Sequence, residues 1–295
     1  GPLVMIAAHQ DEIGLMASYV EEGGSIRLRR VGGVDPRILP GARVWVHAEG
    51  GVLSGVIGAL PPHLLSAEAR KNNYQLDDLF VDLGLPAEQV VEKVPAGTLI
   101  ALYGPLTRLA NNRLASKTMD DRAGVVVMLR AAQLLSGRRF RARVAFVASS
   151  QEEVGSLGAH TAAYALNPDL AVAIDVTHGQ MPGCDPDSTY PLDTVVATAG
   201  PYIHPVLYQH LMDTAKAEHV PVQKSFSSRD TSTDADEMQV ARSGVPAVLL
   251  ELPLKYMHTT VETLSSDTLE EAARLLAAFI TGLDAKEADW LCLKD

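Results

Sequence analysis

The chain has 295 residues, 47% of them hydrophobic, and a formal net charge of −11 at pH 7. This length suits two domains better than one. An acidic chain gains nothing from counterion release at phosphates, so we expect no nucleic acid partner. No apolar run reaches the roughly 20 residues that a membrane helix needs, so no membrane partner is expected either. The two cysteines, Cys184 and Cys292, form no disulfide framework or CxxC site, which favours a cytoplasmic location.

The first predicted element is a strand over residues 3–9, a continuous apolar run that ends in His9. From about residue 17 the pattern changes to short alternating segments separated by Gly and Pro. These segments predict the strands of a small β-barrel or sandwich, at 25–29, 42–47, 51–58 and 99–103. The polar stretch 64–78 predicts a loop.

After about residue 113, helical and apolar segments alternate. Helices are predicted over 121–135, 158–165, 205–219 and 268–283, and strands over 144–148, 170–174 and 247–250. Strands that alternate with helices indicate a mostly parallel sheet flanked by helices. We therefore predict a mixed α/β domain made of residues 1–16 and 113–295, interrupted by an all-β insertion at 17–112.

Chemistry-bearing residues follow the first two strands of this α/β domain. Asp11 lies two residues beyond His9, on the same face of an extended chain, and could accept a hydrogen bond from its imidazole. Glu152 and Glu153 follow the strand 144–148 directly, and two adjacent carboxylates repel one another. Either a bound cation compensates them, or they form a solvated acidic loop.

Other candidate residues lie at element ends as well. Asp120 and Asp121 stand at the start of a helix, where one Asp would serve as a cap and a second needs another explanation. Asp175 directly follows the predicted strand 170–174, and His258 lies soon after the strand 247–250. A single His is usually structural, and we interpret His160, His178 and His204 in that way.

Taken together, these residues converge on the sheet edge where ligands of α/β proteins gather. A set of His, Asp and Glu without Cys favours a catalytic metal pair over a structural zinc site. Neither a GxSxG elbow nor a phosphate-binding glycine loop is present, which disfavours serine hydrolases and nucleotide binding.

Six motifs carry a family resemblance. They are AHQDEIG (8–14), KTMDDRAG (117–124), QEEVGSLGA (151–159), AIDVTHG (173–179), TDAD (233–236) and YMHTTVE (256–262). They resemble the TET-type glutamyl aminopeptidases, which are two-metal exopeptidases with some members labelled cellulase or endoglucanase. The motifs run in the family's order and span nearly the whole chain. The resemblance also implies further residues ahead of Gly1.

The resemblance implies a role for each candidate residue. His9, Asp120 and Asp175 would hold one metal, and Asp120, Glu153 and His258 the other. Glu152 would be the general base of a metal-bridging hydroxide, and Asp11 the partner of His9. The peptide bond after Asp120 is often cis in such enzymes.

The resemblance further implies two divalent metal ions per subunit, with zinc or cobalt ahead of manganese, and peptides as substrates. The α/β domain would be catalytic and zinc-exopeptidase-like, and the insertion would form dimers within a homo-oligomer that can reach a tetrahedral dodecamer. Alternative functions are a metal-dependent deacylase or another two-metal amidohydrolase, a glycosidase, and a non-catalytic interaction protein. A glycosidase would use two carboxylates and no metal pair.

Overall fold

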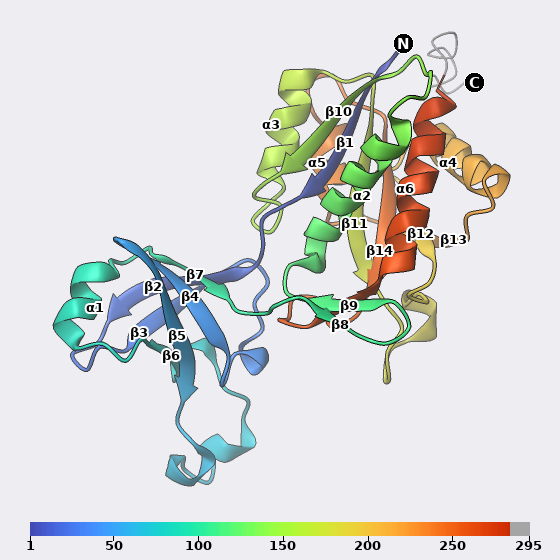
Figure 1. Cartoon of the computed structure of the whole chain (residues 1–295). Coiled ribbons are helices and arrows are strands. Elements are labelled where there is room, and N and C mark those ends of the chain that lie inside the picture. Colours follow the sequence, from blue (N-terminus) through green and yellow to red (C-terminus); the bar gives the residue numbers. More distant parts are fainter. Residues whose placement is uncertain (284–295) are drawn as a thin grey trace. The chain divides into compact units, whose positions relative to one another are not determined.

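The computed structural model describes residues 1–283 and divides them into two compact units (Figure 1). The sheet unit comprises Gly1–Asp11, Leu106–Met257 and the residues from Glu262 on. The barrel unit comprises Glu12–Pro105 and the short segment His258–Val261. Cys292 lies outside the described residues.

A six-stranded sheet forms the centre of the sheet unit, in the order β10-β1-β11-β14-β12-β13. Four neighbouring strands of this sheet are parallel: β10 (Arg143–Ser149), β1 (Leu3–His9), β11 (Leu170–His178) and β14 (Ala247–Leu254). The other two, β12 (Val195–Ala199) and β13 (Val222–Phe226), are parallel to each other, and β12 is antiparallel to β14. The mixed, mostly parallel sheet confirms the predicted α/β class.

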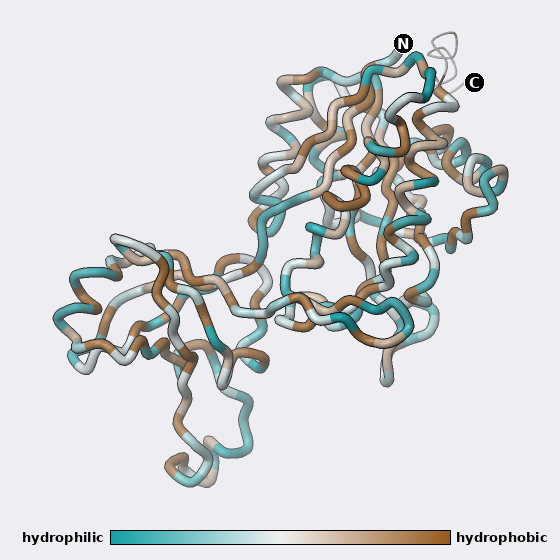
Figure 2. The backbone as a smooth tube through the Cα atoms, in the orientation of Figure 1, coloured by the Kyte–Doolittle hydropathy of each residue, from teal (hydrophilic) through white to brown (hydrophobic). Residues whose placement is uncertain are grey.

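Helices cover both faces of this sheet. Figure 1 shows α2 (Met119–Leu135) and α6 (Ser266–Thr281) lying side by side across one face. On the same face, α4 (Pro205–Ala217) packs against α6. On the other face, α3 (Leu157–Leu166) packs against α5 (Asp234–Gln239). Because both faces are covered, the central strands need apolar side chains throughout, and they lie mostly in the hydrophobic range of Figure 2.

The strand β11 is longer than the predicted 170–174. It pairs with β14 in parallel as far as His178, so Asp175 lies inside the strand and opposite Glu251. Asp175 is only 5% exposed. The continuous apolar run ends at Ile174, but the hydrogen-bonded pairing of β11 with β14 continues. Polar side chains do not interrupt strand pairing where they have partners in the site.

The barrel unit is built around a closed barrel in the order β2-β3-β6-β5-β4-β7. Its strands are β2 (Gly14–Val20), β3 (Ile26–Val31), β4 (Arg43–Ala48), β5 (Gly51–Ala59), β6 (Leu79–Asp82) and β7 (Leu99–Leu102). Their inward side chains form a core of their own that includes Ile26, Val46 and Ile100. A short helix, α1 (Ala87–Lys93), belongs to the same unit.

The sequence pattern predicts an insertion at 17–112. The main segment of the barrel unit, Glu12–Pro105, begins and ends a few residues earlier. It includes all of β2, and the chain enters the sheet unit at Leu106. There β8 (Thr107–Arg108) and β9 (Arg113–Ser116) join β15 (Glu262–Ser265) in a small sheet. The stretch 64–78, predicted to be a loop, contains two short 3-10 turns, η3 (Ala69–Lys71) and η4 (Leu76–Asp78), and a third, η2 (Pro62–Leu64), leads into it.

Two further short turns are η1 (Pro36–Ile38) in the barrel unit and η5 (Pro186–Ser188) in the sheet unit. Within residues 1–283, no helix combines the length and the hydrophobicity that crossing a membrane requires.

Candidate metal-binding and catalytic site

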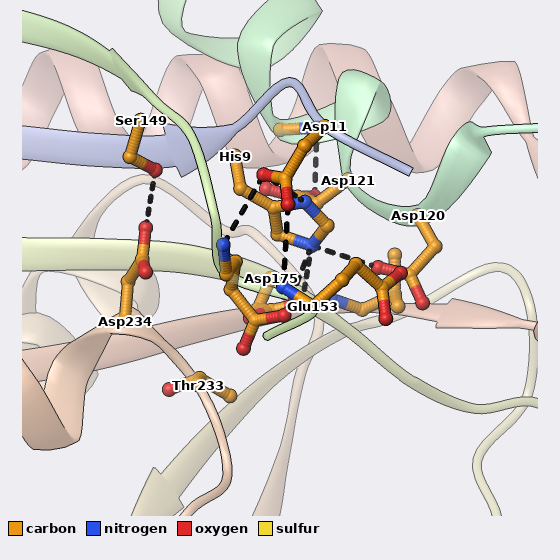
Figure 3. Close-up of polar contacts among 12 residues, drawn as sticks. His9, Asp11, Asp120, Asp121, Ser149, Glu153, Asp175, Thr233 and Asp234 are labelled. Carbon is orange, nitrogen blue, oxygen red and sulfur yellow. Dashed lines mark hydrogen bonds and ion pairs between the residues drawn. The ribbon is translucent and has the colours of Figure 1, made fainter. Parts of the chain in front are cut away.

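His9 is the last residue of β1 and lies at the centre of the candidate site (Figure 3). It is 1% exposed, and its Nε2 atom lies 3.0 Å from Oδ1 of Asp120 and 4.0 Å from Oδ1 of Asp175. The strand register brings Asp175 to this level, because Ala7 of β1 pairs with Ala173 of β11 two residues earlier. One ligand atom from each of these three side chains lies within 4.8 Å of the others. This arrangement suits a single cation.

Asp120 belongs to the first turn of α2, where the chain departs from helical geometry. Thr118 has a positive φ of 63°, and the peptide bond between Asp120 and Asp121 is cis, as the family resemblance implies. The backbone N–H of Asp120 donates to Oε2 of Glu262 at 3.1 Å. Both aspartates are buried, and Asp121 accepts from the backbone N–H of Gly124, three residues on, as a helix cap does.

Glu152 and Glu153 lie in the turn that follows β10. Their backbone N–H groups donate to the two carboxylate oxygens of Asp11, at 3.2 and 3.3 Å. Oε2 of Glu152 is 3.9 Å from Nε2 of His9, and a carboxylate oxygen of Glu153 lies within 4.8 Å of one of Asp120. The turn therefore presents two carboxylates to the site that β1 and α2 form.

Asp11 connects the imidazole to this turn. Its Oδ1 is 3.6 Å from Nδ1 of His9, on the side of the ring opposite Asp120. Burial alone would raise the pKa of Asp11, but the contact with His9 and the two backbone N–H groups lower it. A single ionised carboxylate thus orients the His9 ring and holds the backbone of Glu152 and Glu153.

The electrostatics of the site are dominated by buried acids. Burial raises the pKa of Asp175 well above its usual range, and so do Asp121 and Asp120. Burial raises the pKa of Glu152 to about 7; the charge of His9 acts in the opposite direction, and nearby carboxylates, Asp234 first, add to the rise. Burial would lower the pKa of His9, but Asp11 and Asp120 raise it far above its ordinary value.

This donor set fits divalent cations. Several carboxylates converge on one imidazole, and carboxylate oxygen with imidazole nitrogen is the ligand chemistry of catalytic zinc, cobalt and manganese sites. A cation would also remove the repulsion among the acids, which burial otherwise makes unfavourable.

The structure brings together most of the site residues predicted from the sequence: His9, Asp11, Asp120, Glu152, Glu153 and Asp175. His258 opens the segment His258–Val261 of the barrel unit, where its Nδ1 lies 3.2 Å from the carbonyl oxygen of Gly33. Two of the histidines interpreted as structural have other contacts: His160 contacts Glu237 at 2.9 Å, and His204 caps α4. The third, His178, is the last residue of β11.

Two buried acids near the site received no individual role from the sequence patterns. Asp121 is 0% exposed and accepts from the backbone N–H of Gly124 at 3.0 Å. Asp234 is 1% exposed and accepts a hydrogen bond from the hydroxyl of Ser149. The TDAD motif at 233–236 was the one sequence signal for Asp234.

Comparisons with known proteins point to one family. Residues 1–275 match the family described as M42 glutamyl aminopeptidase. The chain is 35% identical to a lysyl aminopeptidase of Pyrococcus furiosus over 287 residues, which cover 96% of this chain and 82% of the relative.

Solved structures agree with this assignment. A TET aminopeptidase from a marine sediment archaeon of the Thaumarchaeota is 30% identical with a TM-score of 0.93, covering 99% of this chain and 84% of that chain. A TET1 peptidase of Pyrococcus horikoshii, which can assemble into a tetrahedron or a large octahedral shell, is 30% identical with a TM-score of 0.83. That match covers 96% of this chain and 84% of the other.

The first testable prediction concerns Asp11. Asp11→Asn should weaken metal binding about 10- to 100-fold, the usual effect of losing a carboxylate that orients a ligating His. Calorimetric titration of zinc into chelator-stripped protein measures the change. Asp213→Asn, at an exposed position on α4, is the matched control and should bind zinc as the wild type does. Equal affinities for all three proteins would contradict the role assigned to Asp11.

Proposed function

Because the chain belongs to the M42 glutamyl aminopeptidase family, we propose that it removes N-terminal residues from peptides using two divalent cations and Glu152 as general base. Membership makes the chain a metal-dependent aminopeptidase. The observation that carries the finer proposal is the convergence of His9, Asp120 and Asp175 within 4.8 Å, with Glu152 3.9 Å from the same imidazole nitrogen.

The proposed division of ligands gives His9 and Asp175 to one cation and Glu153 and His258 to the other, with Asp120 shared. Zinc or cobalt is the expected metal, followed by manganese. For His258 the support is chain connectivity. It lies between β14 and β15, and Glu262, the first residue of β15, accepts a hydrogen bond from the backbone of Asp120.

His258→Ala should therefore lower the metal content from two equivalents to about one, since removing one of few ligands weakens a site strongly. Elemental analysis after dialysis measures the stoichiometry. The control is His160→Ala, because His160 is partly exposed and pairs with Glu237 away from the ligand set. An unchanged stoichiometry in His258→Ala would remove His258 from the ligands.

In the proposed mechanism the bound cations would lower the pKa of a water molecule and polarise the carbonyl of the first peptide bond. Glu152 accepts the proton of the attacking water and passes it to the leaving amine. The hydroxyl of Ser156 donates to Oε1 of Glu152 at 3.4 Å, which leaves Oε2 directed to the side of His9. Asp11 fixes the backbone from which the Glu152 side chain extends.

The test combines a substrate panel with one substitution. Wild-type enzyme reloaded with zinc, cobalt or manganese should hydrolyse aminoacyl-p-nitroanilides but not their N-acetylated forms. Chelation should abolish the activity. Cleavage of N-acetylated substrates would favour a deacylase or another amidohydrolase, and chelator-resistant cleavage of glycosides would favour a glycosidase.

Glu152→Gln should lower kcat by about 10²- to 10⁴-fold, the range that a general acid–base residue contributes. The amide preserves size and hydrogen bonding while removing the proton acceptor, so metal content should stay at the wild-type value. Wild-type turnover by this variant would show that another group acts as the base.

We also propose that copies of this chain associate through the barrel unit, as members of a homo-oligomer in a cytoplasmic setting. The barrel carries exposed apolar side chains, among them Tyr19, Val52 and Leu64, each more than half exposed. Such residues on a small domain favour an interface with another protein. The relative from Pyrococcus horikoshii assembles into shells, a tetrahedron being one.

Light scattering on the purified protein should give a mass that is a multiple of the chain mass, up to a dodecamer. Replacing Val52 by Asp should shift the distribution towards smaller species, because a charge in an apolar interface is unfavourable. A monomer at all concentrations would contradict the proposal.

A further inference from the structure

Asp234 is a buried carboxylate that the proposed mechanism does not use. It is the first residue of α5, and its side chain is directed towards the end of β10 rather than into the His9 cluster (Figure 3). The hydroxyl of Ser149, the last residue of β10, donates to Oδ2 of Asp234. Burying a carboxylate is unfavourable unless it has partners, so this placement needs an explanation.

Asp234 lies close to the turn that carries both glutamates. Ser149, whose hydroxyl it accepts, stands where this turn begins, three residues before Glu152. Burial raises the pKa of Asp234 to about 6, and the hydrogen bond from Ser149 and the charge of His9 act in the opposite direction. At the other end of the turn, the hydroxyl of Ser156 donates to Oε1 of Glu152, at 3.4 Å. The turn is therefore held at its start by Asp234 and contacts Glu152 at its end.

This turn has a conformation that needs external support. Gln151 and Ser156 both have positive φ values, 63° and 53°, in a region that non-glycine residues seldom adopt. The turn is closed by bonds from the backbone N–H groups of Gly155 and Ser156 to the carbonyl oxygen of Glu152, at 2.9 and 3.1 Å.

The packing around the turn is also tight. A Cβ atom at Gly158 would overlap the backbone of Ser150, so α3 starts directly against the end of β10. Several contacts thus hold the backbone of the turn, and the partner of Ser149 comes from a different element, α5.

We propose that Asp234 is a positioning residue that anchors the start of the 149–156 turn through the hydroxyl of Ser149 and thereby keeps the Glu152 carboxylate oriented for proton transfer. The inference rests on the proposed role of Glu152 as the base. Asp234 itself touches neither metal nor substrate. A small displacement of a reacting group can lower a rate by about 100-fold, so an anchor outside the reacting atoms has a measurable effect.

The test is Asp234→Asn, which keeps the size and an acceptor oxygen but removes the charge that receives the Ser149 hydroxyl. Turnover per folded, metal-loaded enzyme should fall at least tenfold, while KM changes less than twofold and the metal content stays at the wild-type value. The matched control is Glu237→Gln on the same helix, whose exposed side chain pairs with His160 and should leave kcat unchanged. A purely structural role would lower only the unfolding temperature.

Dependence on Glu152 is tested in a double variant. In a Glu152→Gln background, Asp234→Asn should cause less than a twofold further loss, because the group it positions is already absent. An equal loss in both backgrounds, or a wild-type kcat for Asp234→Asn, would overturn the inference.

Two further variants separate the possible failures. If Asp234→Asn does not fold, Ser149→Ala takes its place, since it removes only the hydroxyl that Asp234 accepts. It should show the same fall in kcat, and wild-type turnover would overturn the inference. Glu152→Gln alone tests the base. If Glu152→Gln retains wild-type activity, the proposed function fails. If Glu152→Gln loses activity while Asp234→Asn keeps wild-type activity, only the role of Asp234 is rejected.

Discussion

Repulsion among buried carboxylates is the constraint on which the candidate site depends. Asp120, Asp121 and Asp175 are nearly inaccessible to solvent and lie around one imidazole. In a medium of low polarity such a cluster is unfavourable unless positive charge compensates it. One His cannot balance these acids, so the fold is arranged for cations that are not part of the chain. The parallel sheet makes this arrangement possible, because its strands end at a common edge.

The same constraint explains why so much of the local backbone departs from regular geometry. Thr118, Gln151 and Ser156 all have positive φ values, and each stands beside an acid of the site. The chain must leave its helices and strands abruptly to direct several carboxylates to one point. Asp11 and Asp234 hold the turn after β10 at Glu152, Glu153 and Ser149. Some acids around the site therefore face the His9 ring, and others fix the backbone that carries the glutamates.

Much of the fold could be predicted from the sequence because the relevant patterns are local. The apolar run ending in His9 became β1, and the run before Glu152 became β10, since continuous hydrophobicity marks a strand covered on both faces. The alternating segments were correctly assigned to a barrel or sandwich. The extension of β11 through Asp175 was missed, because its pairing with β14 is a long-range property that no local pattern carries.

The site residues likewise divide into those that local sequence patterns locate and those that depend on long-range contacts. His9 and Glu153 stand at the ends of apolar runs, so their placement could be inferred from the runs themselves. Asp234 could not be found in this way: it opens a helix of six residues after a polar segment, and its partner Ser149 is 85 residues away. The sequence also showed no sign that His258 belongs to the barrel unit, because that assignment depends on the contacts of the four-residue segment His258–Val261. The roles of these residues come from the family resemblance and stay predictions.

The order of the strands has a consequence for how the protein is made. Residues of the proposed first ligand set come from β1, α2 and β11, so they run from His9 to Asp175 along the chain. During synthesis the ribosome releases His9 first, and the sheet that positions it lacks its central neighbour until β11 has emerged. A nascent chain therefore offers a metal ion only scattered, mobile carboxylates for most of translation. Loading of the metal must follow the long-range pairing of the sheet, which places it among the last events in maturation.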